Sequence, residues 1–213
     1  MREYTLKGEK IVHSKEIVPE GYKRRIDFER SLEYLEDFKQ VLDLLKIPFF
    51  LFCGTMIGAY RDDDFVEYDH DADIAVLSKH MSFEQMEEVK RLMVEKGYHI
   101  GGNHKFLDKC TSFYPAKYGH NEKVDLYILY FKDPHYYFVS HLHSQAHPKG
   151  YYGIPYPKKH FDKLDKITFK GIEFNIPSDV EELLEYMWGK WWIAIGGNLG
   201  IVPYQAIKEE EFS

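Results

Sequence analysis

Three aspartates alternate with other residues just before the apolar run 74–76. They are Asp69, Asp71 and Asp73. Carboxylates this close repel one another, and burying one is costly unless it is paired or bound to a metal. Alternate side chains of a strand point to the same face, so the three carboxylates are expected to converge. Their hard oxygen atoms suit Mg²⁺ or Mn²⁺. The spacing predicts a divalent-cation site, and a solvated acidic loop is the alternative.

A further acid follows at a distance along the chain. Asp125 stands alone among strand-forming residues in Val124–Phe131. It is the best candidate for a third carboxylate of the metal site. Lys123 lies two residues earlier, on the same face of this strand, and could be an ordinary lysine at a sheet edge.

A glycine and a threonine stand between the first apolar run and the aspartates. Gly54 and Thr55 interrupt the apolar run 48–53, after which a short helix is predicted at 55–60 and a loop at 61–67.

The elements that must position these groups follow from the spacing of apolar residues. Apolar positions recur every three or four residues from Phe28, which predicts a helix to about Lys46, before Pro48. Ser82 and Gln85 have the spacing of a capping box for a second helix that ends at Gly97. Strands are predicted at 48–53, 69–77, 98–101, about 105–114, 124–131 and 136–140, a hairpin around 170–171, a long loop over 141–165, and a helix from Ser178 to about Met187.

Composition limits the class of protein. The chain has 213 residues, a net charge of −7 and two cysteines. It therefore lacks a basic surface for nucleic acid and the thiols for a disulfide framework. We expect one α/β (α+β) domain over 1–213, with a core at about 28–192 and an N-terminal arm at 1–22. No leader and no transmembrane segment are visible, so we expect a cytoplasmic protein whose membrane contacts, if any, are peripheral.

The order of these features resembles the nucleotidyltransferase superfamily, and the central block is similar to the LicD family, which includes the fukutin-type proteins. That family carries a Gly-Thr-Leu-Leu-Gly-Ala-x-Arg run, then an aromatic residue, an acidic cluster and Asp-Ile. A later Asp-Leu pair matches at 125–126, and a hairpin and an aromatic end are similar to 171–177 and 188–192. The residues that fit the central block are Gly54, Thr55, Gly58, Ala59, Arg61, Phe65, Asp69, Asp71, Asp73 and Ile74.

Three positions depart from the family pattern. Acids at 62–64 stand where the family has small residues, Tyr68 replaces a frequent tryptophan, and His70 replaces one acid of the cluster. By strand alternation His70 lies opposite the metal-facing side, so the metal-binding set is retained. The change at 62–64 concerns contacts to the substrate.

The resemblance implies a nucleotidyltransferase-like mixed sheet flanked by helices, and a phosphotransferase. Such enzymes move phosphocholine, ribitol phosphate or glycerol phosphate from a CDP-linked donor to a sugar hydroxyl of a glycan or a lipid-linked acceptor. It implies Mg²⁺ or Mn²⁺ on Asp71 and Asp73, with Asp125 and Asp69 as further ligands. It also assigns catalysis to Asp71, Asp73 and Asp125. Asp125 would complete the metal site or act as a base toward the acceptor hydroxyl, and both roles stay open. The donor would contact Gly54, Thr55, Arg61 and Lys123. Gly54 lets backbone N–H groups approach a phosphate closely, and Thr55 adds a hydroxyl. Arg61 could offset charge on the donor, with a salt bridge to the neighbouring acids as its alternative, and Lys123 could reach a phosphate. The alternatives are nucleotidyl transfer from an NTP to a small molecule or protein, and a non-catalytic nucleotide- or glycan-binding relative.

Two other groups of residues each have two interpretations. His141, His143 and His147 could bind zinc, although no cysteine is near and a solvated loop is the simpler interpretation. The aromatic group at 186–192, with Tyr186 and three tryptophans, could stack on a sugar or a cytosine, or pack in the core.

Overall fold

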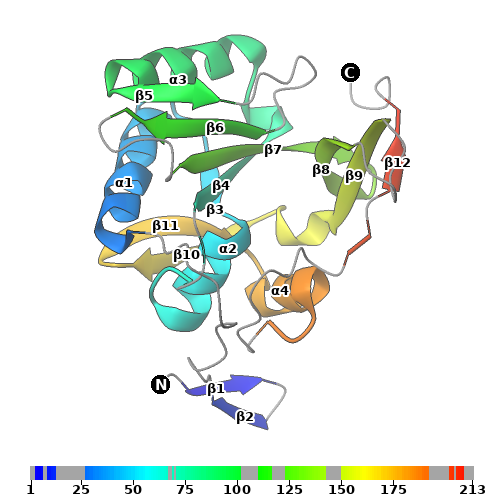
Figure 1. Ribbon diagram of the computed structural model, residues 1–213. Helices are drawn as coiled ribbons and strands as arrows, with labels where there is room; N and C mark the ends of the chain where they lie inside the picture. Colours follow the sequence, from blue (N-terminus) through cyan, green and yellow to red (C-terminus); the bar gives the residue numbers. More distant parts are fainter. Residues whose placement is uncertain are drawn as a thin grey trace.

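A mixed β-sheet forms the centre of the protein. The computed structural model describes residues 3–6, 9–12, 27–66, 69, 71–101, 110–116, 123–142, 150–191, 202–203 and 205–208 (Figure 1). In this part of the chain the eight-stranded sheet runs in the order β12-β9-β8-β7-β4-β3, and β6 joins β7 to β5. Its strands are β3 Phe49–Leu51, β4 Ala72–Leu77, β5 Tyr98–Gly101, β6 Cys110–Pro115, β7 Val124–Lys132, β8 His135–Leu142, β9 Gly150–Pro157 and β12 Gln205–Ile207.

The two central strands bring distant acids together. β4 and β7 are parallel, whereas every other described strand pair is antiparallel. Their register places Asp73 opposite Asp125. All six residues of β4 are buried, as expected for a central strand that is covered on both faces. The start of this parallel pair is therefore where the predicted site must lie.

Two helices pack together beside the sheet. Helix α1, Phe28–Leu44, begins at Asp27, whose side chain accepts a hydrogen bond from the Arg30 backbone N–H. Its apolar positions face inward, with Leu35 and Phe38 fully buried, as the spacing predicts. Helix α3, Phe83–Glu95, begins with the predicted capping box of Ser82 and Gln85. The rings of Phe38 and Phe113 meet edge to face at 4.9 Å and join α1 to β6.

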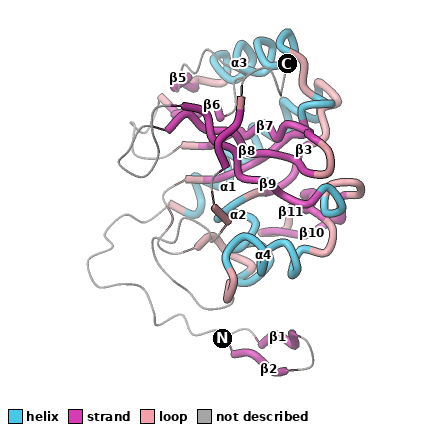
Figure 2. Tube along the Cα trace, turned by 90° about the vertical axis from the view of Figure 1, so that its right-hand side faces the viewer, coloured by secondary structure: helices cyan, strands magenta, loops and turns pink. Residues whose placement is uncertain are grey.

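A hairpin and a short helix lie at the opposite end of the molecule from α3 (Figure 2). β10, Leu164–Phe169, and β11, Ile172–Pro177, are joined by Lys170 and Gly171, both with positive φ, which matches the predicted two-residue turn. The Asn175 amide donates to the Phe49 carbonyl at 2.6 Å and ties β11 to β3. Helix α4, Val180–Trp188, follows directly.

Several expectations need correction. The strand expected from Asp69 begins at Ala72, and the loop expected over 141–165 contains β9, a 3₁₀ turn at Lys158–His160 and the start of β10. β9 contains glycines and prolines that suggest a loop, but pairing with β8 and β12 on its two sides overrides this local preference. The irregular arm expected over 1–22 contains a hairpin of β1, Glu3–Leu6, and β2, Glu9–Val12.

Among the described residues, no helix has the length and apolar character needed to cross a bilayer.

Candidate active site

Three carboxylates converge at the start of β4. One oxygen each from Asp69, Asp71 and Asp73 lie within 4.8 Å of one another, which agrees with the predicted clustering. Asp73 is only 4% exposed, and the other two side chains are half-buried. Asp69 and Asp71 precede the strand, so they reach the cluster from the connecting loop rather than by strand alternation. Because Asp73 is buried, the alternative of a solvated acidic loop does not hold for this cluster.

The Gly54–Thr55 turn holds Asp73 in place. Helix α2, Cys53–Ile57, begins here, directly after β3. The Thr55 hydroxyl accepts a hydrogen bond from the Asp73 backbone N–H at 2.8 Å, and the Gly54 N–H donates to Asp73 Oδ2 at 3.2 Å. A Cβ at position 54 would lie 2.0 Å from Asp69 Oδ2, so only glycine leaves room for that carboxylate. Both residues thus position the acids, and their predicted phosphate contacts stay predictions.

Asp125 is fixed from two sides on the neighbouring strand. It is 5% exposed and lies opposite Asp73 in the β4–β7 register. The Ser112 hydroxyl on β6 donates to Asp125 Oδ1 at 2.6 Å, and the Lys123 ammonium donates to Oδ2. Ser112 is a site residue that sequence reasoning missed. Its part depends on the antiparallel register of β6 with β7, which pairs Ser112 with Asp125 and which local spacing does not reveal.

Lys123 bridges the two groups of acids. Its Nζ lies 2.9 Å from Asp71 Oδ2 and also contacts Asp125, and its side chain is 21% exposed. Burial lowers the pKa of Lys123, but the Asp125 and Asp71 carboxylates outweigh it and raise the pKa above its usual value. Lys123 is therefore a charged partner of the site, not a solvated lysine at a sheet edge. A phosphate contact for it stays a prediction.

The electrostatics of the cluster favour a bound cation. Burial raises the pKa of Asp73 well above its usual range, and the charges of Asp71, Asp69 and Asp125 raise it further. Lys123 lowers this pKa, but it is a weaker influence than the acids. A divalent ion supplies the positive charge that would let all these carboxylates stay ionised together.

Arg61 is a buried residue whose described partners are Asp62 and the Trp191 carbonyl. It belongs to the π-helical turn Gly58–Asp62 and is 2% exposed. Its guanidinium donates to Asp62 Oδ2 at 2.8 and 3.1 Å and to the Trp191 carbonyl at 3.0 Å. The salt-bridge interpretation describes these contacts, and a contact to the donor stays a prediction.

Trp191 is buried and its ring meets Tyr60 at 5.8 Å, as the core interpretation expects.

Some predicted residues lie outside the described part of the chain. They include Tyr68, His70, His143, His147 and Trp192. His141 lies in β8, and its side chain is also not described. Neither the loop interpretation of these histidines nor the zinc alternative is therefore tested by the described residues. Two of the three acids at 62–64 have basic partners: Asp62 pairs with Arg61, and Asp64 pairs with Lys170 at 2.8 Å.

Comparisons with known proteins place these features in context. A family model described as LicD/FKTN/FKRP, nucleotidyltransferase domain, matches residues 46–179. A crystal structure of ANT(2")-Ia in complex with adenylyl-2"-tobramycin is similar at 17% identity and a TM-score of 0.37, over 50% of this chain and 54% of that one. A solution structure of ANT(2'')-Ia is similar at 13% identity and a TM-score of 0.45, over 70% and 66% of the two chains. No curated protein matches the chain significantly.

Proposed function

Because the chain belongs to the LicD/FKTN/FKRP family, we propose that this transferase is a Mg²⁺- or Mn²⁺-dependent phosphotransferase. It moves phosphocholine, ribitol phosphate or glycerol phosphate from a CDP-linked donor to a sugar hydroxyl of a glycan or a lipid-linked acceptor. The observation that carries the proposal is the convergence of Asp69, Asp71 and Asp73 beside Asp125 on parallel strands. Transfer of a phosphoryl-containing group needs positioning and neutralised charge more than covalent help from the protein.

The acids present fit the metal that the reaction needs. Asp69, Asp71 and Asp73 offer only carboxylate oxygens, the donor type that Mg²⁺ and Mn²⁺ prefer. The mutual repulsion that raises the pKa of Asp73 is the repulsion that such an ion relieves. When bound, the ion would neutralise charge on the donor's pyrophosphate.

Asp125 is suited to receive the acceptor's proton or to share the metal. Ser112 and Lys123 each hold one of its two oxygens, so the direction of the carboxylate is fixed. A base must keep such a fixed geometry relative to the hydroxyl that it deprotonates. Lys123 would, in addition, keep part of its positive charge near the donor phosphates, because it contacts both Asp71 and Asp125.

Nucleotide selectivity tests this proposal. Calorimetry would compare CDP with ADP, GDP and UDP, each with Mg²⁺ and with EDTA. We expect Mg²⁺-dependent binding of CDP, lost in Asp71→Asn/Asp73→Asn and kept in Glu84→Gln, which changes an exposed acid at the start of α3. Binding of a purine nucleotide in preference to CDP, with release of pyrophosphate on turnover of its triphosphate, would replace the proposal with nucleotidyl transfer.

A further inference from the structure

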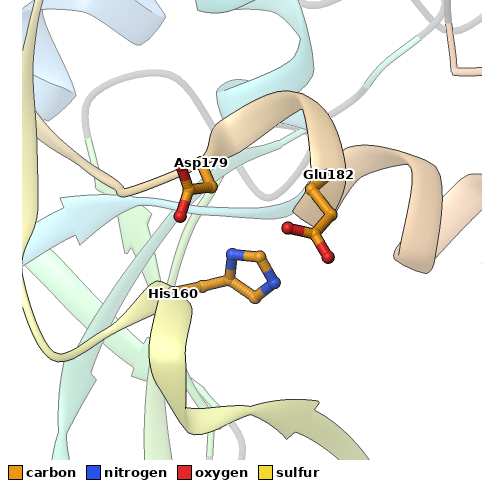
Figure 3. Close-up of side chains that lie close together, drawn as sticks. All are labelled: His160, Asp179 and Glu182. Atoms are coloured by element: carbon orange, nitrogen blue, oxygen red, sulfur yellow. The ribbon is translucent and has the colours of Figure 1, made fainter.

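A second group of metal-ligating side chains lies away from the aspartates. A ring nitrogen of His160 and one oxygen each of Asp179 and Glu182 lie within 4.8 Å of one another (Figure 3). His160 ends the 3₁₀ turn after β9, Asp179 is the residue before α4, and Glu182 lies in the first turn of that helix. None of these residues takes part in the contacts of the Asp69–Asp125 site, so any ligand here is a separate one.

His160 has the setting of a metal-binding histidine. It is 1% exposed, and its Nδ1 lies 3.1 Å from the Ser178 carbonyl oxygen. A carbonyl only accepts hydrogen bonds, so Nδ1 carries the proton and Nε2 of the neutral ring keeps a lone pair. Among the described residues, Nε2 has no hydrogen-bond partner. A histidine that donates one N–H to a backbone carbonyl and keeps the other nitrogen for a ligand is the common arrangement at metal sites.

The side chain of Asp179 does not cap helix α4, although the residue stands in the N-cap position. An aspartate before the first helical residue usually caps the helix by accepting a backbone N–H. Here the Asp179 side chain makes no capping hydrogen bond, and its backbone has a φ of 50°. The side chain lies beside His160 instead (Figure 3). The helix expected from Ser178 therefore begins at Val180, with Asp179 in the N-cap position.

Glu182 can change partners without a large cost. It forms an ion pair with Lys159, but the two side chains are 58% and 56% exposed. Exposed pairs of this kind contribute little to stability, since water screens the attraction and both side chains lose freedom. A divalent cation can therefore replace Lys159 as the partner of this carboxylate.

The cluster opens onto a groove. Asp179 and Glu182 are among the residues that line a cavity of about 950 Å³ between the π-helical turn Gly58–Asp62, the β10–β11 hairpin and α4. Three further acids, Asp165, Glu181 and Glu185, line it with a single lysine, Lys166. Negative charge along the walls raises the local concentration of cations and leaves room for a small ligand beside a bound ion.

We propose that His160, Asp179 and Glu182 bind one divalent transition-metal ion of the Zn²⁺ class. A mixed set of imidazole and carboxylates suits Zn²⁺ and its transition-metal neighbours, whereas Mg²⁺ prefers oxygen ligands alone. Three protein ligands leave a coordination position for water or for an oxygen or nitrogen atom of a small ligand. This inference is independent of the phosphotransferase proposal.

Competition with a chromophoric Zn²⁺ chelator tests the site. The full chain carrying Asp71→Asn/Asp73→Asn serves as the starting protein, so that the first cluster does not contribute. We expect the further substitutions Asp179→Asn/Glu182→Gln to weaken Zn²⁺ binding at least about tenfold. Glu185→Gln, in the same groove and on the same helix, is the matched control and should leave binding unchanged.

A stability measurement adds a second readout. Zn²⁺ should raise the melting temperature of the starting protein, because an ion that binds only the folded state stabilises it. It should not raise that of Asp179→Asn/Glu182→Gln, whose substituted side chains are both exposed and so should not prevent folding. Equal Zn²⁺ affinity and equal thermal shifts in this variant and in Glu185→Gln would overturn the proposal.

Discussion

The two acidic clusters of this protein differ in how they are held. Asp73 and Asp125 are 4% and 5% exposed and lie opposite each other on parallel strands. Asp179 and Glu182 are exposed and lie on one turn at the start of α4. In the first cluster the backbone of the sheet forces like charges together. In the second the side chains can move apart into water.

This difference separates two energetic situations. Burial of several carboxylates destabilises the metal-free protein, because each charge loses water and repels its neighbours. Lys123 offsets this only in part, since the net effect on Asp73 is still a raised pKa. The exposed cluster costs little without a metal and gains little from its ion pair. Removal of a buried carboxylate at the first site should therefore weaken ligand binding without lowering stability, whereas breaking the exposed ion pair at the second should change stability little.

The largest effect is expected from Asp73→Asn. It should weaken Mg²⁺-dependent nucleotide binding by about 100-fold or more, because a buried ligand is lost. In EDTA its melting temperature should equal or exceed that of the unchanged protein, since a desolvated charge is removed and an amide can still accept from Gly54 N–H. Calorimetry and thermal unfolding measure the two effects. A lower melting temperature together with unchanged binding would show that Asp73 stabilises the fold and does not hold the metal.

A smaller loss of binding is expected from Gly54→Ala. The added methyl would lie 2.0 Å from Asp69 Oδ2 and must displace that carboxylate. We expect metal-dependent binding to fall about tenfold. Gly97→Ala is the matched control: its Cβ meets no atom within 4 Å, but its φ of +92° disfavours alanine. That variant should lose about 1 kcal/mol of stability and keep its binding, and equal binding in both variants would contradict the account.

Ser112→Ala should act on turnover rather than on binding. It removes the 2.6 Å hydrogen bond to Asp125 Oδ1, so the carboxylate loses one of its two restraints. We expect kcat of the transfer reaction to fall about tenfold with little change in KM, because geometry in the transition state is affected. Stability should fall by about 1–2 kcal/mol. Ser112→Thr, which keeps a hydroxyl, should restore much of kcat, and its failure to do so would argue against this positioning role.

The smallest effect is expected at the exposed cluster. Lys159→Gln breaks the ion pair with Glu182, whose two side chains are 56% and 58% exposed. The free energy of unfolding in EDTA should change by less than about 0.5 kcal/mol in urea titrations. A loss of several times that amount would show that the Lys159–Glu182 ion pair contributes substantially to stability, so the two clusters would not differ in this respect.

Features that depend on short stretches of sequence were predicted correctly. The close spacing of Asp69, Asp71 and Asp73 predicted that the acids cluster, although the first two reach the site from the loop before β4 and not by strand alternation. The position of Lys123 two residues before Asp125 predicted that both face one site. Both predictions rest on short stretches of sequence. Local spacing likewise predicted the apolar face of α1 and the Ser82–Gln85 capping box, and both are confirmed.

Features that depend on pairing between distant segments were not predictable in this way. Ser112 reaches Asp125 only through the β6–β7 register. β9 is a strand because β8 and β12 flank it, although its own residues suggest a loop. His160 meets Asp179 because the turn after β9 packs beside the start of α4, where the Ser178 N–H donates to the His160 carbonyl at 2.9 Å.

Electron paramagnetic resonance of bound Mn²⁺, with and without CDP, would show whether the aspartates at the start of β4 hold the ion that receives the nucleotide. We expect Mn²⁺ to bind the unchanged protein, CDP to alter its spectrum, and Glu84→Gln to preserve both effects. Asp71→Asn/Asp73→Asn should lose both. Unchanged Mn²⁺ and CDP spectra in that double variant would show that these aspartates do not hold the ion.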